Sequence, residues 1–409
     1  MDIRPILSTL RRHKFTACLL IAEIALTCAI VCNAVFLIGQ RLERMHMTSG
    51  AAEHELVYIQ MAYIGMPPDA MARSAEDVAA LRQLAGVESV TTTNQVLFGN
   101  ASSNMGLRIE PTQQADTIES SQYFGEGIVQ TFGLQLVAGR DFRPEEYQDL
   151  DKVFEALRRG DSNALPKSAL VTRAVADRLW PGEDPLGKQM YVGQAIPLTV
   201  IGVIKQLSRP NDFERGADYS VINPIRIAMS QGAIYVLRCA PQDRDQVLKE
   251  ALAKLKALDP NRIVLKKGTE DQLRHDYFRD DRAMAGILLG VCVALLIVTA
   301  LGIVGLASFW VAQRNRSIGV RRALGATRRN ILRYFQTENF LLTTIGIVLG
   351  MVLAYGINLF LIVHYELPRL PAIYFPVGAL TLWAIGQAAV LGPALRAASV
   401  PPVVATRAA

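Results

Sequence analysis

The segment 182–189 carries the strongest hint of nucleotide chemistry in this sequence. It reads GEDPLGKQ and departs from the phosphate-binding pattern G-x-x-x-x-G-K-[ST] at its last position, where Gln189 replaces the hydroxyl residue that ligates Mg²⁺. Pro185 stands where the pattern needs a flexible, glycine-rich cradle. We therefore predict a structured turn here instead of an ATP site.

No other pattern in the sequence supports catalysis or metal binding. The motifs H-E-x-x-H, C-x-x-C and G-x-S-x-G do not occur, and the histidines His13, His275 and His364 are scattered along the chain. We therefore predict no enzyme active site, no metal site and no cofactor on this chain.

A dense run of positive charge occupies residues 314–333. Seven arginines lie there with no acidic residue among them, which exceeds what anchoring at an anionic membrane surface requires. The local signals predict a short helix through Leu324, a stop at Gly325, and Thr327 as the N-cap of the next helix. A short helix placed between two membrane spans would be a handle on which a cytoplasmic partner could push.

Four apolar runs must position this handle. Residues 15–39, 283–312, 340–363 and 374–395 each exceed the roughly 20 residues that a helix needs to cross a bilayer. The first run contains one acidic residue and the other three contain none. The sequence therefore predicts an integral membrane protein with four transmembrane helices in a 1+3 layout.

The basic residues of the short segments predict the orientation of these helices. Thirteen of them lie in residues 1–14, 314–333 and 396–409, whereas the short loop 364–371 contains Arg369 alone. Because positive charge stays on the cytoplasmic side, both termini are expected there and the large insert outside. The first span is too long for a cleaved signal peptide, so we expect it to remain as an anchor.

The resulting domain layout covers the whole chain. We predict a cytoplasmic N-terminus (1–14), a first transmembrane helix (15–39), a periplasmic core domain (40–282), a second helix (283–312), a cytoplasmic coupling loop (313–339), a third helix (340–363), an external loop (364–373), a fourth helix (374–395) and a cytoplasmic tail (396–409).

The external insert is predicted to be an α/β domain. Its 29 basic and 33 acidic residues make it mildly acidic, so the high pI of the chain reflects membrane topology and not nucleic-acid binding. Strand-helix-strand patterns over 55–98 and 232–266 predict one α/β module, with a β-rich subdomain inserted at about 140–228. Its single cysteine, Cys239, excludes an intrachain disulfide there. The charged stretch 269–282 is expected to continue as a helix into the second span.

Two kinds of residue stand out inside the predicted spans. Glu23 lies about a dozen Å into the first span, where an ionised carboxylate is costly unless it is paired, so it is a candidate functional residue, with an interhelical hydrogen bond or an interfacial arginine as the simpler explanation. The pairs Gly286/Gly290 and Gly346/Gly350 make G-x-x-x-G spacings that permit close helix packing.

The arginine-rich segment resembles a known family. Its residues 314–332, RNRSIGVRRALGATRRNIL, are similar to the signature of MacB/FtsX-type permeases of ABC transporters, and the tail PALRAASVPPVVATR at 393–407 resembles their usual ending. Three weaker matches, AGRDF at 138–142, WPGEDPLGK at 180–188 and VIGVIK at 200–205, are similar to the MacB-type periplasmic core domain.

The resemblance implies a permease subunit in the bacterial inner membrane. It implies a separate ATPase that carries ATP and Mg²⁺, a second permease as homodimer or heterodimer partner, and commonly an adaptor protein and an outer-membrane duct. MacB itself carries its ATPase ahead of the first span, whereas only 14 residues precede the span here, so we expect the ATPase on another polypeptide. The residues expected to couple to this ATPase are Arg314, Arg316, Ile318, Gly319, Arg321, Arg322, Leu324, Gly325 and Arg328.

Three functions fit this layout. The first is export of peptides, antibiotics or similar amphiphiles. The second is release of lipoproteins by a permease of the same layout, and the third is FtsX-like regulation of a cell-wall hydrolase. The large insert favours export, because the regulators typically carry a smaller one. A sensor receptor is disfavoured, since no kinase or effector domain follows the last span.

Overall fold

The computed structural model describes residues 14–63, 69–99, 101–161, 165–193, 196–211, 216–365 and 369–399 of the 409. The chain divides into two compact units, a membrane unit of Met1–Met45 with Asp280–Ala409 and a globular unit of His46–Arg279. Residues 1–13 and 400–409 lie outside the described residues. The expectations for the N-terminus and for most of the tail, and the orientation that they support, therefore stay predictions.

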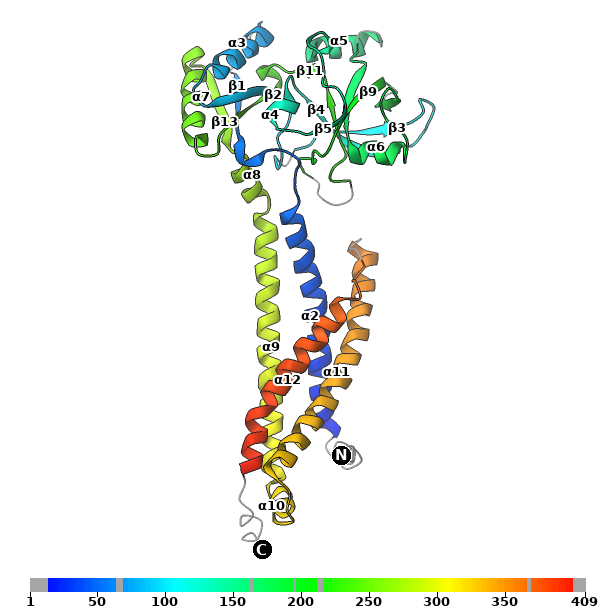
Figure 1. Cartoon of the computed structure of the whole chain (residues 1–409), viewed down its shortest axis with the longest axis vertical. Helices are drawn as coiled ribbons and strands as arrows, with labels where there is room; N and C mark the ends of the chain where they lie inside the picture. Colours follow the sequence, from blue (N-terminus) through cyan, green and yellow to red (C-terminus); the bar gives the residue numbers. More distant parts are fainter. Residues whose placement is uncertain are drawn as a thin grey trace. The chain divides into compact units, whose positions relative to one another are not determined.

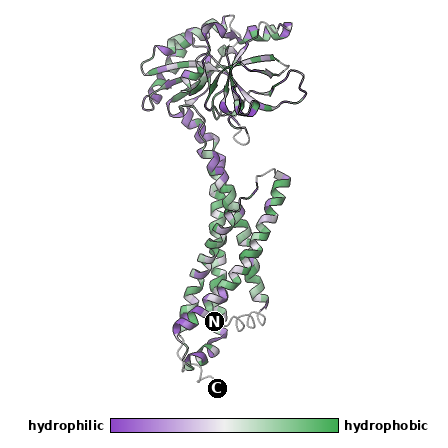
Figure 2. Cartoon of the chain, turned by 45° about the vertical axis from the view of Figure 1, so that its right-hand side comes forward, coloured by the Kyte–Doolittle hydropathy of each residue, from purple (hydrophilic) through white to green (hydrophobic). Residues whose placement is uncertain are grey.

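The membrane unit contains the four long apolar helices that the sequence predicts. They are α2 (Lys14–His46), α9 (Arg279–Gln313), α11 (Arg328–Tyr365) and α12 (Tyr374–Ser399), and each is long and apolar enough to cross a membrane. Figure 2 shows them as predominantly hydrophobic ribbons. Each helix is longer than its predicted span, most of all α11, which begins at Arg328 where the span was expected from 340, because helical hydrogen bonding continues into the polar residues beside the apolar run.

Helix α2 is the most enclosed of the four. Half of its most apolar stretch is buried, compared with 17% for α9. The hydroxyl oxygens of Thr27 on α2 and Thr299 on α9 lie 2.8 Å apart, and the Asn33 side-chain amide donates to the Ala354 carbonyl of α11 at 3.1 Å. In an apolar solvent such interhelical hydrogen bonds replace the hydrophobic effect as the force that associates helices.

Glycine lets α11 approach α2 closely. A Cβ added at Gly346 would lie 2.7 Å from Cγ2 of Ile24, and one at Gly350 would lie 2.5 Å from Cβ of Cys28. The other predicted pair, Gly286 and Gly290 on α9, has no described atom within 4 Å of such a Cβ. The two pairs therefore have different surroundings in a single chain, although their spacing in the sequence is the same.

Replacing Gly350 by Val should destabilise the membrane unit by about 1–3 kcal/mol, the usual cost of overpacking. The added atoms would collide with Cys28 and with the Ala25 carbonyl, 2.7 Å from the new Cβ. Gly356→Val is the matched control on the same helix, since no described atom lies within 4 Å of its Cβ. Thermal unfolding in detergent measures both. An equal loss in both variants would show that packing against α2 is not the cause.

Strands from the beginning and from the end of the globular unit together form a four-stranded sheet, which two helices cover (Figure 1). Its elements are β1 (Leu56–Tyr63), α3 (Ala70–Arg82), β2 (Val87–Thr93), β12 (Ile234–Cys239), α7 (Arg244–Leu258) and β13 (Arg262–Thr269). The strand order β13-β1-β12-β2 is that of two interleaved β-α-β units, a ferredoxin-like arrangement. The two predicted strand-helix-strand segments therefore form one module, although about 140 residues separate them.

A second, seven-stranded sheet fills the sequence between the halves of this module. It has the order β5-β9-β7-β10-β4-β3-β8, and β8 pairs back with β9, so six of its strands close into a ring. The strands are β3 (Asn104–Arg108), β4 (Ile118–Phe124), β5 (Leu136–Gly139), β7 (Ser168–Thr172), β8 (Gln189–Val192), β9 (Ile196–Ile204) and β10 (Ser220–Asn223). Short helices α4 (Ile128–Thr131), α5 (Leu150–Arg159) and α6 (Arg173–Leu179) and the two-stranded sheet of β6 (Gln148–Asp149) and β11 (Ile225–Arg226) accompany it.

This β-rich region starts at Asn104, earlier than the 140–228 expected from the sequence. The reason lies in β4, whose buried residues Ser120, Ser121 and Gln122 are polar and show no hydrophobic alternation. They are satisfied by side-chain hydrogen bonds, such as that from the Gln95 amide to the Ser121 hydroxyl at 2.8 Å. A strand whose buried side chains are polar gives no hydrophobic pattern from which to predict it.

The charged stretch before the second span is not one continuous helix. Helix α8 (Glu270–Tyr277) ends one residue before α9 begins, and Phe278 between them has φ −90° and ψ 14°. The break has no glycine or proline, so composition could not reveal it. Aromatic packing at Phe278 accompanies the break: its ring lies 4.9 Å from that of Tyr277 and 5.9 Å from that of Phe98, measured between centroids.

Glu270, the first residue of α8, is a buried carboxyl group. The residue is 1% exposed, and its Oε1 has no hydrogen-bond partner among the described residues. Burial raises the pKa of Glu270 well above its usual value, and the neighbouring charges of Glu53 and Asp271 raise this pKa further. Burial raises the pKa values of the Tyr58 and Tyr123 phenols, and the charge of Glu270, where it is ionised, raises them further. The raised pKa favours the uncharged form of Glu270 over a wider pH range than for an exposed glutamate.

Glu270→Gln should make the folded chain more stable at pH 8 and should leave its stability near pH 4 almost unchanged. Since the folded-state pKa of Glu270 is raised, wild-type stability falls as pH rises above the unfolded-state pKa of about 4.3, and a one-unit rise in pKa corresponds to about 1.4 kcal/mol. Thermal unfolding between pH 4 and 8 measures this, with exposed Asp276→Asn as the control. Parallel pH profiles for wild type and Glu270→Gln would contradict the prediction.

Candidate functional site

The arginine-rich handle is a short helix, α10 (Asn315–Ala323), between α9 and α11. It ends in a Schellman motif, because the Gly325 amide donates to the Arg322 carbonyl at 3.1 Å and the Ala326 amide donates to the Arg321 carbonyl at 3.0 Å. Gly325 has φ +98°, a conformation that L side chains rarely adopt. The Asn330 amide then donates to the Thr327 hydroxyl, which caps α11. The predicted helix, stop and cap are confirmed.

One face of α10 is packed against the membrane helices. Ile318 is 5% exposed and Gly319 is buried beside it. Ile318 belongs to an apolar cluster at the ends of α9, α11 and α12. Its other members are Val311, Ile331, Phe335, Ala394, Ala397 and Ala398. This contact fixes the rotation of α10, so its remaining residues point outward.

The opposite face of α10 combines aliphatic and basic side chains. Val320 and Leu324, one turn apart, are 47% and 83% exposed. Arg316 and Arg321 of α10, and Arg328 at the start of α11, are exposed as well. The Arg321 guanidinium lies over the Tyr334 ring, 5.1 Å from its centroid. We call this face, made of Arg316, Val320, Arg321, Leu324 and Arg328, the docking face. It offers apolar side chains and positive charge.

A buried ion pair holds the corner where α9 turns into α10. Arg314 Nη1 lies 2.8 Å and 3.1 Å from the two carboxylate oxygens of Glu338 on α11. The side chains are 14% and 2% exposed. The Arg314 guanidinium also stacks over the Trp310 ring, 5.7 Å from its centroid. Since breaking a buried pair leaves an uncompensated charge, this pair strongly disfavours any rearrangement that separates α10 from α11.

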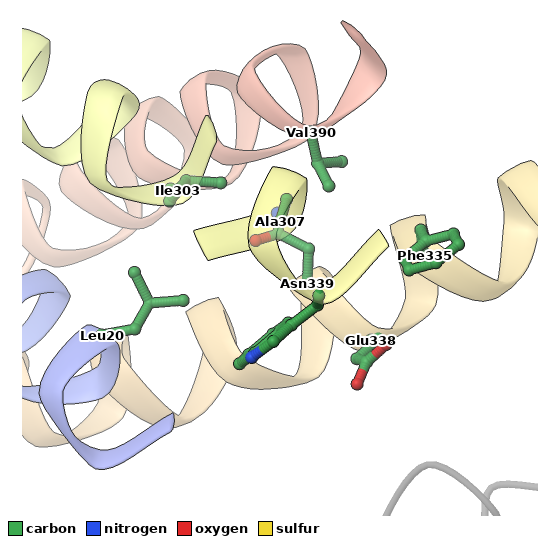
Figure 3. Close-up of a pocket in the computed structure, with 8 residues that line it drawn as sticks. Leu20, Ile303, Ala307, Phe335, Glu338, Asn339 and Val390 are labelled. Carbon is green, nitrogen blue, oxygen red and sulfur yellow. The ribbon is translucent and has the colours of Figure 1, made fainter. Parts of the chain in front are cut away.

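A small cavity is lined by Glu338 of this pair, and Figure 3 labels Glu338 among the residues around it. Its volume is about 10 Å³ of space for the centre of a water molecule, enough for one water. All four membrane helices line it, through Leu20 (α2), Ile303, Ala307 and Trp310 (α9), Phe335, Glu338 and Asn339 (α11) and Val390 (α12). The cavity is therefore a junction of the bundle and far too small for a drug-sized ligand.

Sequence reasoning missed Glu338. The residue lies 24 positions after Arg314, outside the arginine run and directly before the third apolar span. An acidic residue at the start of an apolar span was the available signal, because burial there requires a nearby cation. Asn339 donates to the Gly386 carbonyl of α12 at 2.9 Å. Sequence reasoning missed it too, because it also lies outside the arginine run.

Glu23 lies apart from this site. It is half-buried on α2, and a Cβ added at Gly302 of α9 would lie 2.7 Å from its Oε2. The hydrogen-bonded hydroxyls of Thr27 and Thr299 are one turn away on the same two helices. No ion pair joins Glu23 to another of the described residues. Its functional role stays a prediction. The segment 182–189, in contrast, forms the predicted turn, with Lys188 ion-paired to Glu183.

Glu338→Gln should destabilise the membrane unit by about 3 kcal/mol, because it leaves the largely buried Arg314 without a countercharge. Trypsin should also cleave α10 faster, since the corner is no longer fixed. The double variant Arg314→Met with Glu338→Met should recover most of the stability, as apolar replacements of buried pairs usually do. Thermal unfolding in detergent measures the stability of the single and the double variant, and a trypsin time course measures the cleavage of α10. A double variant as unstable as the single one would exclude the ion pair as the cause.

Comparison with known proteins covers both units. Residues 25–255 match the family model of the MacB-like periplasmic core domain, and residues 289–402 match that of the FtsX-like permease C-terminal part. The first match includes the globular unit as far as α7, and the second includes α10 and the ion pair. Each half of the chain thus resembles the same class of protein.

Curated relatives agree with these matches. The chain is similar to the uncharacterized ABC transporter permease YknZ of Bacillus subtilis, with 23% identity over 87% of this chain and 85% of the relative. It is 30% identical to the macrolide export ATP-binding/permease protein MacB of Nitrobacter winogradskyi, over 57% of this chain but 37% of that protein. The periplasmic region of MacB from Actinobacillus actinomycetemcomitans aligns with a TM-score of 0.33, at 17% identity, over 57% of this chain and 97% of that structure.

Proposed function

Since this chain belongs to the ABC transporter permeases that carry a MacB-like periplasmic core domain and an FtsX-like C-terminal part, we propose that it transmits ATP-driven movement to its globular unit. A separate ATPase binds ATP and Mg²⁺ and supplies the movement. The globular unit uses it to export peptides, antibiotics or similar amphiphiles. The name of the Nitrobacter winogradskyi relative, macrolide export protein, supports this cargo class.

The docking face of α10 carries this proposal. Exposed aliphatic side chains together with exposed arginines suit a partner with an apolar pocket and an acidic rim. The inward residues Ile318 and Gly319 and the Arg314–Glu338 pair make α10 rigid relative to α11. A displacement of the docking face would therefore move the start of a membrane-spanning helix, and α10 would act as a coupling element.

The charge distribution supports an orientation that makes the docking face accessible to a cytoplasmic ATPase. With the arginines of residues 314–333 in the cytoplasm, both termini lie there too, and the globular unit lies in the periplasm of a bacterial inner membrane. A second permease, an adaptor protein and an outer-membrane duct would complete the assembly.

Reversing the charges of Arg321 and Arg322, an adjacent arginine pair on α10, should separate the chain from its partner ATPase. Inverting charge at an interface commonly costs 2–5 kcal/mol, so affinity should fall by about 30-fold or more. Co-purification and the ATPase rate of the assembled complex measure this. Arg158→Glu with Arg159→Glu, an adjacent arginine pair on α5 of the globular unit, is the matched control and should bind normally.

Two results would contradict the proposal. If the wild-type chain co-purifies with no ATPase, the proposed coupling to a separate ATPase fails. If the ATPase binds equally to wild type and to the Arg321/Arg322 variant, the docking face is a membrane anchor and coupling occurs elsewhere.

A further inference from the structure

Two segments of the globular unit connect it covalently to membrane helices. Residues 47–55 follow α2 directly, and we call them the entry segment. Residues 269–278 precede α9 directly and contain α8, and we call them the exit segment. These two segments are the covalent routes by which movement of the membrane helices can reach the globular unit, so the contacts between them bear on how it arrives.

Arg274 of the exit segment bonds to the entry segment at two places. Its Nη1 lies 2.8 Å from both carboxylate oxygens of Glu53, and its Nη2 donates to the Met47 carbonyl at 2.6 Å. The Ser49 hydroxyl donates to the same Glu53 carboxylate at 2.5 Å. The Arg274 and Glu53 side chains are 22% and 10% exposed. These charged hydrogen bonds are therefore only weakly screened by solvent and stronger than neutral ones.

Aromatic rings hold the guanidinium in place. Arg274 lies over the rings of Phe98 and Phe278, 5.1 Å and 5.7 Å from their centroids. Phe98 is 2% exposed and has φ +56°, the one positive φ at a non-glycine residue in the described ranges. Such backbone strain persists only where the surroundings impose it, and it concentrates at sites with a mechanical or binding role. Phe278 is the residue at which α8 and α9 are interrupted.

We propose that Arg274 is a positioning residue that joins the entry and exit segments into one cooperative element. Movement arriving through either α2 or α9 then enters the globular unit through both segments together. The membrane unit has a matching contact, since Arg41 near the end of α2 forms an ion pair with Asp281 near the start of α9. The entry and exit segments are thus bonded to each other in the globular unit, and α2 and α9, which they continue, are bonded to each other in the membrane unit.

His54 and Asp271 form a second ion pair between the segments, and the His54 side chain is 81% exposed. An exposed pair of this kind contributes little to stability. This pair should therefore not replace the bonds of Arg274 when Arg274 is removed.

Hydrogen exchange of the full-length chain in detergent tests this coupling directly. Cooperative elements open together, so in wild type the amides of Ala52 and Glu55, both hydrogen-bonded, and those of α8 should exchange with the same response to low urea. In Arg274→Met the entry amides should exchange about tenfold or more faster, as expected for lost charged hydrogen bonds, and the α8 amides should follow a separate response. A merely structural role would accelerate both segments equally.

Arg244→Met is the matched control. Arg244 is ion-paired with Asp271 of α8 and donates to the Pro241 carbonyl, and neither partner lies in the entry segment, so its loss should weaken α8 while the two segments still exchange together. Arg274→Lys, which keeps the charge but not two simultaneous bonds, should show partial separation. If the segments exchange in common in Arg274→Met, or exchange separately in wild type, the proposal is overturned.

A second measurement rests on the proposed function. Arg274→Met should retain the ATPase, because the docking face is unchanged, but should lose most ATP-driven export in cells. Full export by this variant would contradict the role of Arg274 in transmission. If wild type binds no ATPase, the proposed function fails and the exchange experiment still decides the coupling of the two segments.

Discussion

The burial of charge at the ends of membrane helices is the constraint on which this structure depends. Each apolar span ends where the chain must turn, and the turn places polar backbone and arginine side chains next to a water-poor bundle. Arg314 and Glu338 solve this problem for the corner between α9 and α11. Because either partner alone would be an uncompensated buried charge, the pair forces the corner into one geometry. The orientation of α10, and therefore its docking face, follows from that geometry.

Arginine–carboxylate pairs recur wherever segments remote in the sequence must be held together. In the globular unit, Arg262 of β13 and Asp77 of α3 are paired at 2.8 Å with side chains 3% and 1% exposed. The Tyr235 hydroxyl donates to the same carboxylate at 2.5 Å. Arginine suits this role because its planar group bonds to several acceptors in fixed directions. A force applied to one segment is then passed to another through short bonds instead of through flexible side chains.

Sequence patterns predicted what depends on hydrophobic periodicity and on helix-end chemistry. The four spans were predicted, although α11 begins at Arg328 and its span was expected from 340. The stop at Gly325 followed from the αL conformation that glycine tolerates. Strand β4 was missed because its buried side chains are polar, and Glu338 because its partner is 24 residues away. Pairing between distant polar residues leaves no local pattern, so only the folded chain reveals it.

The central position of α2 has a consequence for how the protein is made. Helix α2 emerges from the ribosome before the other membrane helices. Its Asn33, however, bonds to the Ala354 carbonyl, 321 residues later, and its Cys28 packs against Gly350 of the same later helix. At about 5–20 residues per second, translation needs roughly 15–60 s to supply these partners. During that interval the polar groups of Glu23, Thr27 and Asn33 face lipid or the insertion machinery. Biogenesis of this permease therefore includes an interval of roughly 15–60 s in which α2, the most enclosed helix of the finished protein, is not yet covered by its partner helices.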